Sequence, residues 1–263
     1  MSNNTILQIS QEEYLACIGL LRLPIPLGLG EDPSAGYTEE LLNIVLMVAM
    51  GSLSAHNIVD QQAEVMVIHP EYSDLLSIPS LADSCLLVNG IDHEKNTTGY
   101  YYFHNQQIVF HSSPKDRVHR LEYQSSLTQV INHCVNVLSP TSTHNHATQF
   151  RIHANDLSSV LEAISVGQTQ TAVSILRRSG MAHDSLAFFL DSLGLNPQRY
   201  AFVRFKGLQS PEPNVKSFVV FQGLGETWCA EQLLNNGDDS MMAVSTVTSD
   251  DLYTRLLQLV ESM

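Results

Sequence analysis

The sequence predicts an α+β protein built from two similar halves, each with the element order β-α-α-α-β-meander-α. Apolar residues make up 44 % of the 263 residues and charged residues 15 %, a composition typical of chains that bury a core and unlike that of disordered proteins. Helical apolar spacing followed by alternating apolar spacing occurs twice along the chain. Two like halves imply a pseudo-two-fold axis. The alternative, that α+β chains often share such an order of elements without duplication, stays open.

The first half opens with a short strand that passes directly into a helix. Residues 6–9 are mostly apolar, and Ser10 stands at the N-cap position with Glu13 three residues later, which is the pattern of a capping box. Apolar residues follow at helical spacing. We expect the helix to end before Pro24, because a residue that precedes proline avoids the α conformation.

Two further helices are expected in the first half. One runs from the cap Thr38 to Leu53. Its apolar run, residues 41–51, is about half as long as a membrane span and contains Asn43, so it predicts a buried helix rather than a membrane helix. The other helix is short and starts after Pro70.

An antiparallel meander follows these helices. Turn-forming residues at 89–90 (Asn-Gly), at Asn105 and at 112–114 (Ser-Ser-Pro) separate its strands. Ser125 is then expected to cap a helix that reaches Leu138. The runs rich in β-branched and aromatic residues are 85–88, 99–103, 108–111 and 118–123.

A segment without periodicity marks the boundary between the halves. Residues 139–148, Ser-Pro-Thr-Ser-Thr-His-Asn-His-Ala-Thr, are rich in linker residues. We therefore divide the chain into an N-terminal half, 1–138, a linker, 139–148, and a C-terminal half, 149–263.

The second half repeats the order of the first. Residues 9–15 and 152–157 share a strand end, a capping position, an acidic residue and a first apolar position. Asn155 or Asp156 is expected to cap the first helix of this half, and Gly194 to end the third. The expected elements are a strand at 150–152, helices at 157–164, 170–178 and 184–193, strands at 200–205, 218–221, 227–230 and 242–247, and a helix at 252–260.

The charge balance disfavours nucleic acid and membranes as partners. A net charge of −14, from 27 acidic and 13 basic residues, opposes contact with phosphate backbones and anionic membrane surfaces. Such a chain can attract basic partners, although many cytoplasmic proteins are this acidic without a specific reason.

Cysteine spacing and the N-terminus indicate a reducing compartment. The four cysteines lie far apart without a CxxC pair, which favours buried free thiols over a zinc site or disulfides. The first ten residues lack the basic and apolar regions of a secretion signal. We therefore expect a cytoplasmic protein.

No pattern indicates a catalytic residue, a cofactor or a metal site. His144, His146 and His153 have metal-like spacing, but no carboxylate or cysteine flanks them. Nucleophile-elbow and phosphate-loop motifs are absent, and residues 223–225, Gly-Leu-Gly, join two strands as a hairpin turn. The histidines of the first meander are interpreted as solvated or satisfied, and they are His104, His111 and His119. An enzyme whose site is assembled from residues remote in sequence stays an alternative.

Binding of a protein partner is the remaining prediction. Aromatic and apolar residues on the last strands lie next to an acidic loop, and exposed aromatic residues anchor partners. The alternative is that these residues face the core. Edge strands of a meander can also accept a strand from a second copy, so a homodimer is expected as one arrangement. The candidate partner-binding residues are Phe218, Phe221, Leu224, Trp228, Asp238 and Asp239.

Several segments together resemble one known family. They are residues 21–27 (Leu-Arg-Leu-Pro-Ile-Pro-Leu), 68–76 followed by Pro79, 201–205, 217–221 and 226–228. In this order they are similar to the EspG family, cytosolic chaperones of mycobacterial type VII secretion that bind PE–PPE substrate pairs. The resemblance implies a central antiparallel sheet flanked by helical bundles, in one compact pseudo-symmetric body. It also implies that sheet surfaces, loops and the C-terminal helical bundle hold the helical tip of a substrate.

The leading hypothesis is therefore a non-enzymatic, EspG-like chaperone. It would bind a secreted helical substrate and keep the hydrophobic helical tip of that substrate soluble, which requires an apolar surface with polar surroundings. The alternative is an immunity or regulatory protein whose acidic charge complements a basic toxin or another protein partner.

Overall fold

The computed structural model describes residues 5–30, 36–62, 65–92, 95–138, 140, 148–194, 197–233 and 241–261. The chain divides into two compact units that interleave in sequence. The first unit contains residues 1–86, 98–130 and 205–214, and the second contains 87–97, 131–204 and 215–263. Most of the linker predicted at 139–148 lies outside the described residues.

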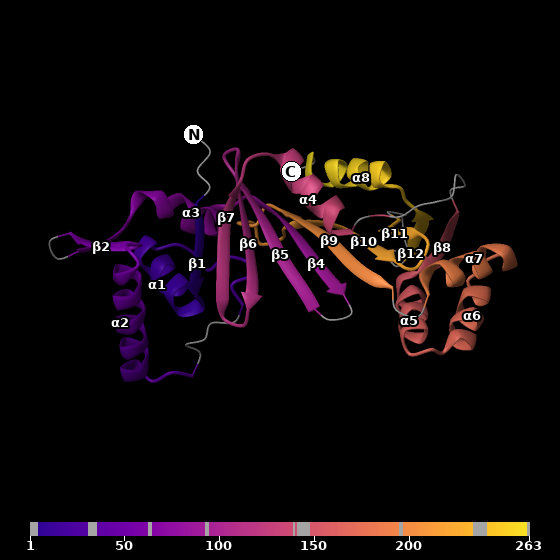
Figure 1. Ribbon diagram of the computed structural model, residues 1–263, viewed down its shortest axis with the longest axis horizontal. Coiled ribbons are helices and arrows are strands. Elements are labelled where there is room, and N and C mark those ends of the chain that lie inside the picture. Colours follow the sequence, from indigo (N-terminus) through magenta and orange to yellow (C-terminus); the bar gives the residue numbers. More distant parts are fainter. Residues whose placement is uncertain are drawn as a thin grey trace. The chain divides into compact units, whose positions relative to one another are not determined.

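The element order of each half agrees with the predicted order (Figure 1). In the first half the elements are β1 (Ile6–Ser10), α1 (Gln11–Leu21), α2 (Glu39–Ala55), β2 (Val59–Gln62), β3 (Val65–Ile68), α3 (Pro70–Leu81), β4 (Ser84–Asp92), β5 (Lys95–His104), β6 (Gln107–Lys115), β7 (Val118–Gln124) and α4 (Leu127–Leu138). In the second half they are β8 (Gln149–His153), α5 (Ala154–Ser165), α6 (Thr169–Arg178), α7 (His183–Leu193), β9 (Gln198–Lys206), β10 (Asn214–Gln222), β11 (Thr227–Gln232), β12 (Met241–Thr246) and α8 (Ser249–Glu261). The hairpin of β2 and β3 between α2 and α3 was not predicted from the sequence.

The strands form a large sheet of ten strands and a separate two-stranded hairpin. The order in the large sheet is β1-β7-β6-β5-β4-β9-β10-β11-β12-β8. Its pairs β1–β7, β6–β7, β10–β11, β11–β12 and β12–β8 are antiparallel. A mixed α+β fold with a large antiparallel sheet is thus confirmed.

In the first unit the predicted capping box starts α1. The Glu13 backbone N–H donates to Ser10 Oγ at 3.2 Å, and the Ser10 backbone N–H donates to Glu13 Oε2 at 2.7 Å. The box directs the buried side of α1, with Tyr14, Cys17 and Ile18, onto the core of this unit. The helix ends at Arg22, whose backbone is left-handed, before Pro24 as predicted.

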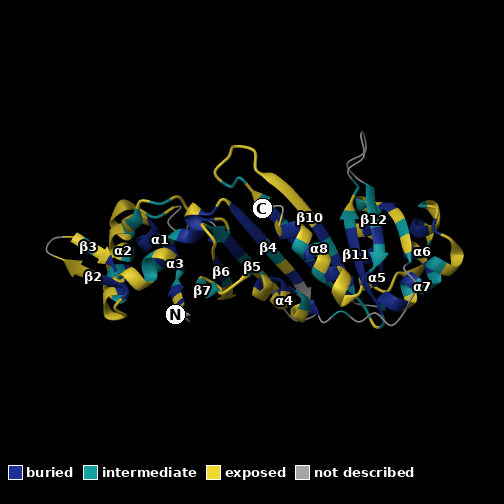
Figure 2. Cartoon of the chain, turned by 90° about the horizontal axis from the view of Figure 1, so that it is seen from above, coloured by how far each residue is buried: buried dark blue, intermediate teal, exposed yellow. Residues whose placement is uncertain are grey.

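The expectation that residues 41–51 form a buried helix is wrong. The segment is helical, and Thr38 caps α2 as predicted, with its Oγ1 accepting from the Leu41 N–H at 3.3 Å. Only Ala49 and Leu53 of α2 are buried, because α1 and β2 cover one side of it. Exposed residues cover much of its surface (Figure 2).

Two predicted turns of the first meander are in fact parts of strands. Asn89 and Gly90 lie inside β4, where a Cβ on residue 90 would lie 2.6 Å from the Tyr200 ring. This glycine therefore permits a close approach rather than a turn. Residues 112–114 lie inside β6, at an irregularity in its register with β7. The predicted turn at Asn105 is confirmed, since Asn105 has a positive φ of 46°.

Two predicted caps are displaced. The side chain that caps α4 is Ser126, whose Oγ accepts from the Gln129 N–H at 3.2 Å, and not Ser125. Helix α5 begins at Ala154, so Asn155 and Asp156 already lie in its first turn. The N-cap position of α5 is His153, the last residue of β8, and its side chain makes no capping hydrogen bond.

In the second unit, strand β11 separates two groups of helices. Trp228 and Ala230 belong to a core formed with α5, α6 and α7. The alternate residues Cys229 and Glu231 instead contact Arg255 of α8, as expected from the two-residue period of a strand. All four cysteines of the chain are free and buried, as predicted.

Candidate functional site

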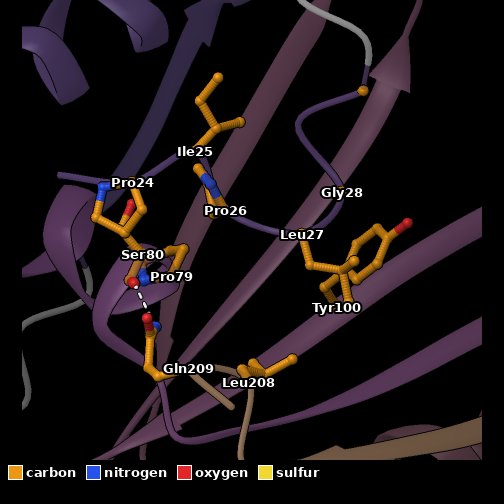
Figure 3. A pocket seen from close by; sticks show the side chains of 11 residues that line it. Pro24, Ile25, Pro26, Leu27, Gly28, Pro79, Ser80, Tyr100, Leu208 and Gln209 are labelled. Atoms are coloured by element: carbon orange, nitrogen blue, oxygen red, sulfur yellow. Dashed lines mark hydrogen bonds between the residues drawn. The ribbon is translucent and has the colours of Figure 1, made fainter. Parts of the chain in front are cut away.

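A cavity of about 580 Å³ lies in the first unit (Figure 3). None of the residues around it carries a charged side chain. Its lining comes from the loop after α1, the end of α3, strand β5 and the loop after β9: Pro24, Ile25, Pro26, Leu27, Gly28, Gly30, Pro79, Ser80, Tyr100, Leu208 and Gln209.

The proline-rich loop on one side of the cavity is held at several points. Prolines fix two of its φ angles, which stiffens the segment. The Leu29 N–H donates to the Pro26 carbonyl at 3.3 Å, and the buried Gln11 Nε2 donates to the Leu29 carbonyl at 3.1 Å. The Tyr102 hydroxyl donates to the Leu27 carbonyl. The loop is therefore a fixed wall, although Ile25 and Leu27 are exposed.

Tyr100 forms a second wall against this loop. Its ring stacks on Tyr102 with centroids 6.1 Å apart, and a Cβ on Gly28, whose φ is +87°, would lie 2.4 Å from it. Only glycine permits this backbone so close to the ring. Burial, with a smaller contribution from Cys85, raises the pKa of Tyr100, so its hydroxyl stays neutral at physiological pH.

The floor joins two segments that are far apart in sequence. Gln209 Nε2 donates to the Ser80 carbonyl at 3.0 Å, as the dashed line in Figure 3 shows. The Gly207 and Leu208 N–H groups donate to the Asp83 carbonyl at 2.8 and 3.1 Å. The cavity thus offers apolar surface, a phenol and a carboxamide. This chemistry suits a neutral, partly apolar group of a ligand rather than an ion.

The structure separates the predicted partner-binding residues. Phe218, Phe221 and Trp228 are buried, as in the alternative that they face the core. Leu224 is 88 % exposed. Asp238 and Asp239 lie outside the described residues.

Trp228 has a packing role that its burial explains. Its ring lies 4.8 Å from that of Phe189 and 6.1 Å from that of Phe150, and its Nε1–H donates to Ser192 Oγ at 2.9 Å. A buried indole with a satisfied N–H stabilises a core and leaves no atom for a partner.

Leu224 projects from a structured turn. Residues 223–225 join β10 to β11, which confirms the predicted hairpin turn. The Gly225 N–H donates to the Ser192 carbonyl at 3.3 Å, so the turn is fixed against the end of α7. An exposed leucine on a fixed turn is suited to contact a partner.

Two buried histidines were not recognised as a pair from the sequence. His111 Nε2 lies 2.8 Å from His119 Nδ1, and their other ring nitrogens have no hydrogen-bond partner among the described residues. Burial, and secondarily His119, lowers the pKa of His111 to about 3. Burial also lowers the pKa of His119, against a smaller opposite effect of Glu12. Both rings are therefore neutral at pH 7.

Metal ligands and membrane spans give no further candidate. Within the described ranges, no group of three or more histidine, cysteine, aspartate or glutamate side chains could hold a metal ion. His144 and His146 lie outside these ranges, and His153 is exposed at the start of α5. No described helix has the length and apolarity to span a membrane.

Comparison with known proteins gives a likeness in structure alone. No family model and no curated protein matches the sequence. Among solved structures, the Mycobacterium tuberculosis type VII secretion system chaperone EspG5, in complex with the PE25–PPE41 dimer, is similar with a TM-score of 0.68. The alignment covers 98 % of this chain and 97 % of that chain at 10 % sequence identity. The EspG-like fold predicted from the sequence is thereby confirmed.

Proposed function

We propose that this protein is a cytoplasmic, non-enzymatic chaperone that binds the hydrophobic helical tip of a secreted protein. The likeness to EspG5 over nearly the whole of both chains is the observation that supports it most, because the solved EspG5 structure contains a bound protein dimer. A shared fold alone does not fix a function. The proposal therefore also needs a surface on this chain that can hold a partner.

Leu224 provides that surface in our proposal, together with Asp238 and Asp239, which follow β11 in the sequence. The exposed leucine supplies the apolar contact, and the two acidic side chains supply selectivity. Phe218, Phe221 and Trp228 act from the core, where they hold the β10–β11 hairpin in place.

Recovery of partners from the native host tests this proposal. The tagged chain should co-purify a secreted protein with a helical hairpin, and coexpression with the chain should make that protein soluble. Leu224→Glu should reduce recovery at least about tenfold, because an apolar contact becomes a buried charge. Val137→Glu, at another exposed position, is the matched control. Recovery without any secreted protein would contradict the chaperone role.

The net charge of −14 supports a second candidate function. An immunity or regulatory protein could use this charge to bind a basic toxin. Binding would then weaken steeply with salt, and a toxin gene would lie beside the gene for this chain. Secretion components in the same place would favour the chaperone.

We also propose that the two halves arose from one repeated plan with pseudo-two-fold symmetry. The strand order of the sheet supports this, because it is the same from either end when β1 is equated with β8, β7 with β12, β6 with β11, β5 with β10 and β4 with β9. Homologous sequences in which the halves are more alike would test it.

A further inference from the structure

The exposed side of helix α2 carries a continuous apolar stripe. Leu41, Ile44 and Val48 are 43, 47 and 66 % exposed, and they recur at the three- and four-residue spacing of one helix face. Gly51 and Ala55, also exposed, continue the same face for one more turn. Met47, 68 % exposed, lies along its border. We call these six residues the α2 stripe: Leu41, Ile44, Met47, Val48, Gly51 and Ala55.

The α2 stripe lies opposite the side of α2 that packs on its own unit. Ala49 and Leu53 face the core, and α1 and β2 are the neighbours of α2 on that side. The helix is thus apolar on two opposite sides, a pattern typical of helices buried all round. After Glu40 it contains no charged residue. In a chain with a net charge of −14, this face is an exception that a partner would explain.

Residue sizes along the α2 stripe are complementary to those of an identical stripe in the opposite direction. Its first half carries the large Leu41 and Ile44, and its second half carries Gly51 and Ala55. Apart from the neighbouring backbone of α2 itself, no described atom lies within 4 Å of the place where a Cβ of Gly51 would be, so a side chain from outside can lie on it. Antiparallel pairing centred on Val48 would set Leu41 against Ala55 and would bring Ile44 within one residue, about 1.5 Å along the axis, of Gly51. Large against small residues interdigitate closely, as packed helices require.

Charge favours the same direction. Glu39 and Glu40 form the first turn of α2. A parallel pair would place four carboxylates together, whereas an antiparallel pair separates the two acidic ends by about 25 Å, the length of a 17-residue helix. Each acidic end then lies near the exposed His56 of the other helix.

We propose that this protein forms a symmetric dimer in which the α2 stripe pairs antiparallel with the α2 stripe of a second copy. The occupant is a second copy because, in an antiparallel pair, the large residues of each stripe lie against the small residues of the other. The acidic first turns of the two helices also lie apart. Such a contact is isologous, and it closes after two copies without leaving a free stripe. The dimer is independent of the proposed chaperone function.

Sedimentation velocity over roughly a hundredfold concentration range tests the dimer. Because only one helix of each copy forms the contact, we expect association to depend on concentration. A species of twice the 29.2 kDa monomer mass should accumulate as concentration rises. Val48→Glu should weaken association at least about tenfold, because two unpaired carboxylates would meet at the centre of the contact. The control Val166→Glu makes the same change at a residue of similar exposure, and it should leave the dimer intact.

Gly51→Leu separates loss of the dimer from loss of the fold. Leucine is a better helix former than glycine, so the melting temperature of the monomer should not fall. The large side chain would nevertheless fill the space that Ile44 of the second copy occupies. Dimer loss together with an unchanged or higher melting temperature supports the proposal. A wild-type chain that stays monomeric, or a dimer that persists in both Val48→Glu and Gly51→Leu, overturns it.

Cross-linking under mild oxidation tests the direction. The four natural cysteines are buried, so introduced cysteines should react without a background. The double variant Ile44→Cys and Gly51→Cys should give a covalent dimer in the antiparallel arrangement. Ile44→Cys alone should give no covalent dimer, because position 44 of one copy then lies far from position 44 of the other. A covalent dimer from Ile44→Cys alone would overturn the antiparallel direction.

Discussion

The buried pair of His111 and His119 should make the protein sensitive to mild acid. The pKa of His111 is lowered from 6.5 to about 3 in the folded state, chiefly by burial. Between these values the unfolded chain binds a proton that the folded chain does not, so stability falls as pH falls below about 6.5. The loss is on the order of 2 kcal/mol at pH 5 for His111 alone. The melting temperature should therefore drop by about 5 °C between pH 7.5 and pH 5.

A double variant assigns that loss to the pair. His111→Phe with His119→Phe removes both titrating rings together and leaves no single buried partner. Its melting temperature should vary less with pH than that of the wild type. The exposed His183→Gln serves as a control that should keep the full pH dependence. Equal pH dependence in all three proteins would rule out the histidine pair as the cause.

Gly28 tests how rigidly the loop and Tyr100 form the cavity. Gly28 and Gly30 both have a φ of +87°, so alanine at either position costs about 1–2 kcal/mol of backbone energy. At Gly28 the new methyl would also overlap the Tyr100 ring, adding about 1–3 kcal/mol, whereas at Gly30 the nearest atom is 3.7 Å away. Urea unfolding should therefore show Gly28→Ala to be the less stable variant. Equal stability would mean that the ring moves freely.

Among the elements, α1 gives the clearest test of a local sequence signal. Ser10→Ala removes the hydroxyl that accepts from Glu13 N–H and should lower the free energy of unfolding by about 1 kcal/mol. Ser158→Ala, at an exposed position inside α5, is the matched control and should be neutral or slightly stabilising. A loss of the same size in both variants would show that the capping box contributes little.

Elements were predictable where the signal lies within one stretch of sequence. The predictions were wrong where the structure depends on a residue that is distant in sequence. Ser10 and Thr38 identified two helix starts because a cap is made within one turn of chain. The sequence predicts a turn at Gly90 because nothing in it reveals the Tyr200 ring beside this residue. The exposure of α2 was missed for the same reason, since apolar spacing predicts a helix but does not say what covers it.

At the scale of the whole molecule, the fold could be predicted from the order of elements, whereas the cavity could not be predicted from the sequence. The structure resembles EspG5 at only 10 % identity, so the fold is shared although few of the residues are the same. The cavity is made by residues 24–30, 79–80, 100 and 208–209, which have no common motif. The one local signal is the Leu-Pro-Ile-Pro-Leu segment, whose prolines stiffen the chain but do not reveal the opposite wall of the cavity.

The interleaving of the two units predicts that the halves of the sequence do not fold well apart. The first unit takes residues 205–214 from the second half, and the second unit takes 87–97 and 131–138 from the first. A fragment of residues 1–138 would lack the Gly207 and Leu208 N–H groups that bind the Asp83 carbonyl. We expect fragments 1–138 and 149–263 to melt well below the full chain, without its cooperativity, in circular dichroism.

Mixing the two fragments supplies the control, because it restores every segment of each unit except the predicted linker. The mixture should recover part of the cooperative transition, and its near-ultraviolet circular dichroism should return toward that of the full chain as the aromatic side chains pack again. Fragments that each melt cooperatively at the temperature of the full chain would instead show that the halves, and not the interleaved units, are the folding units.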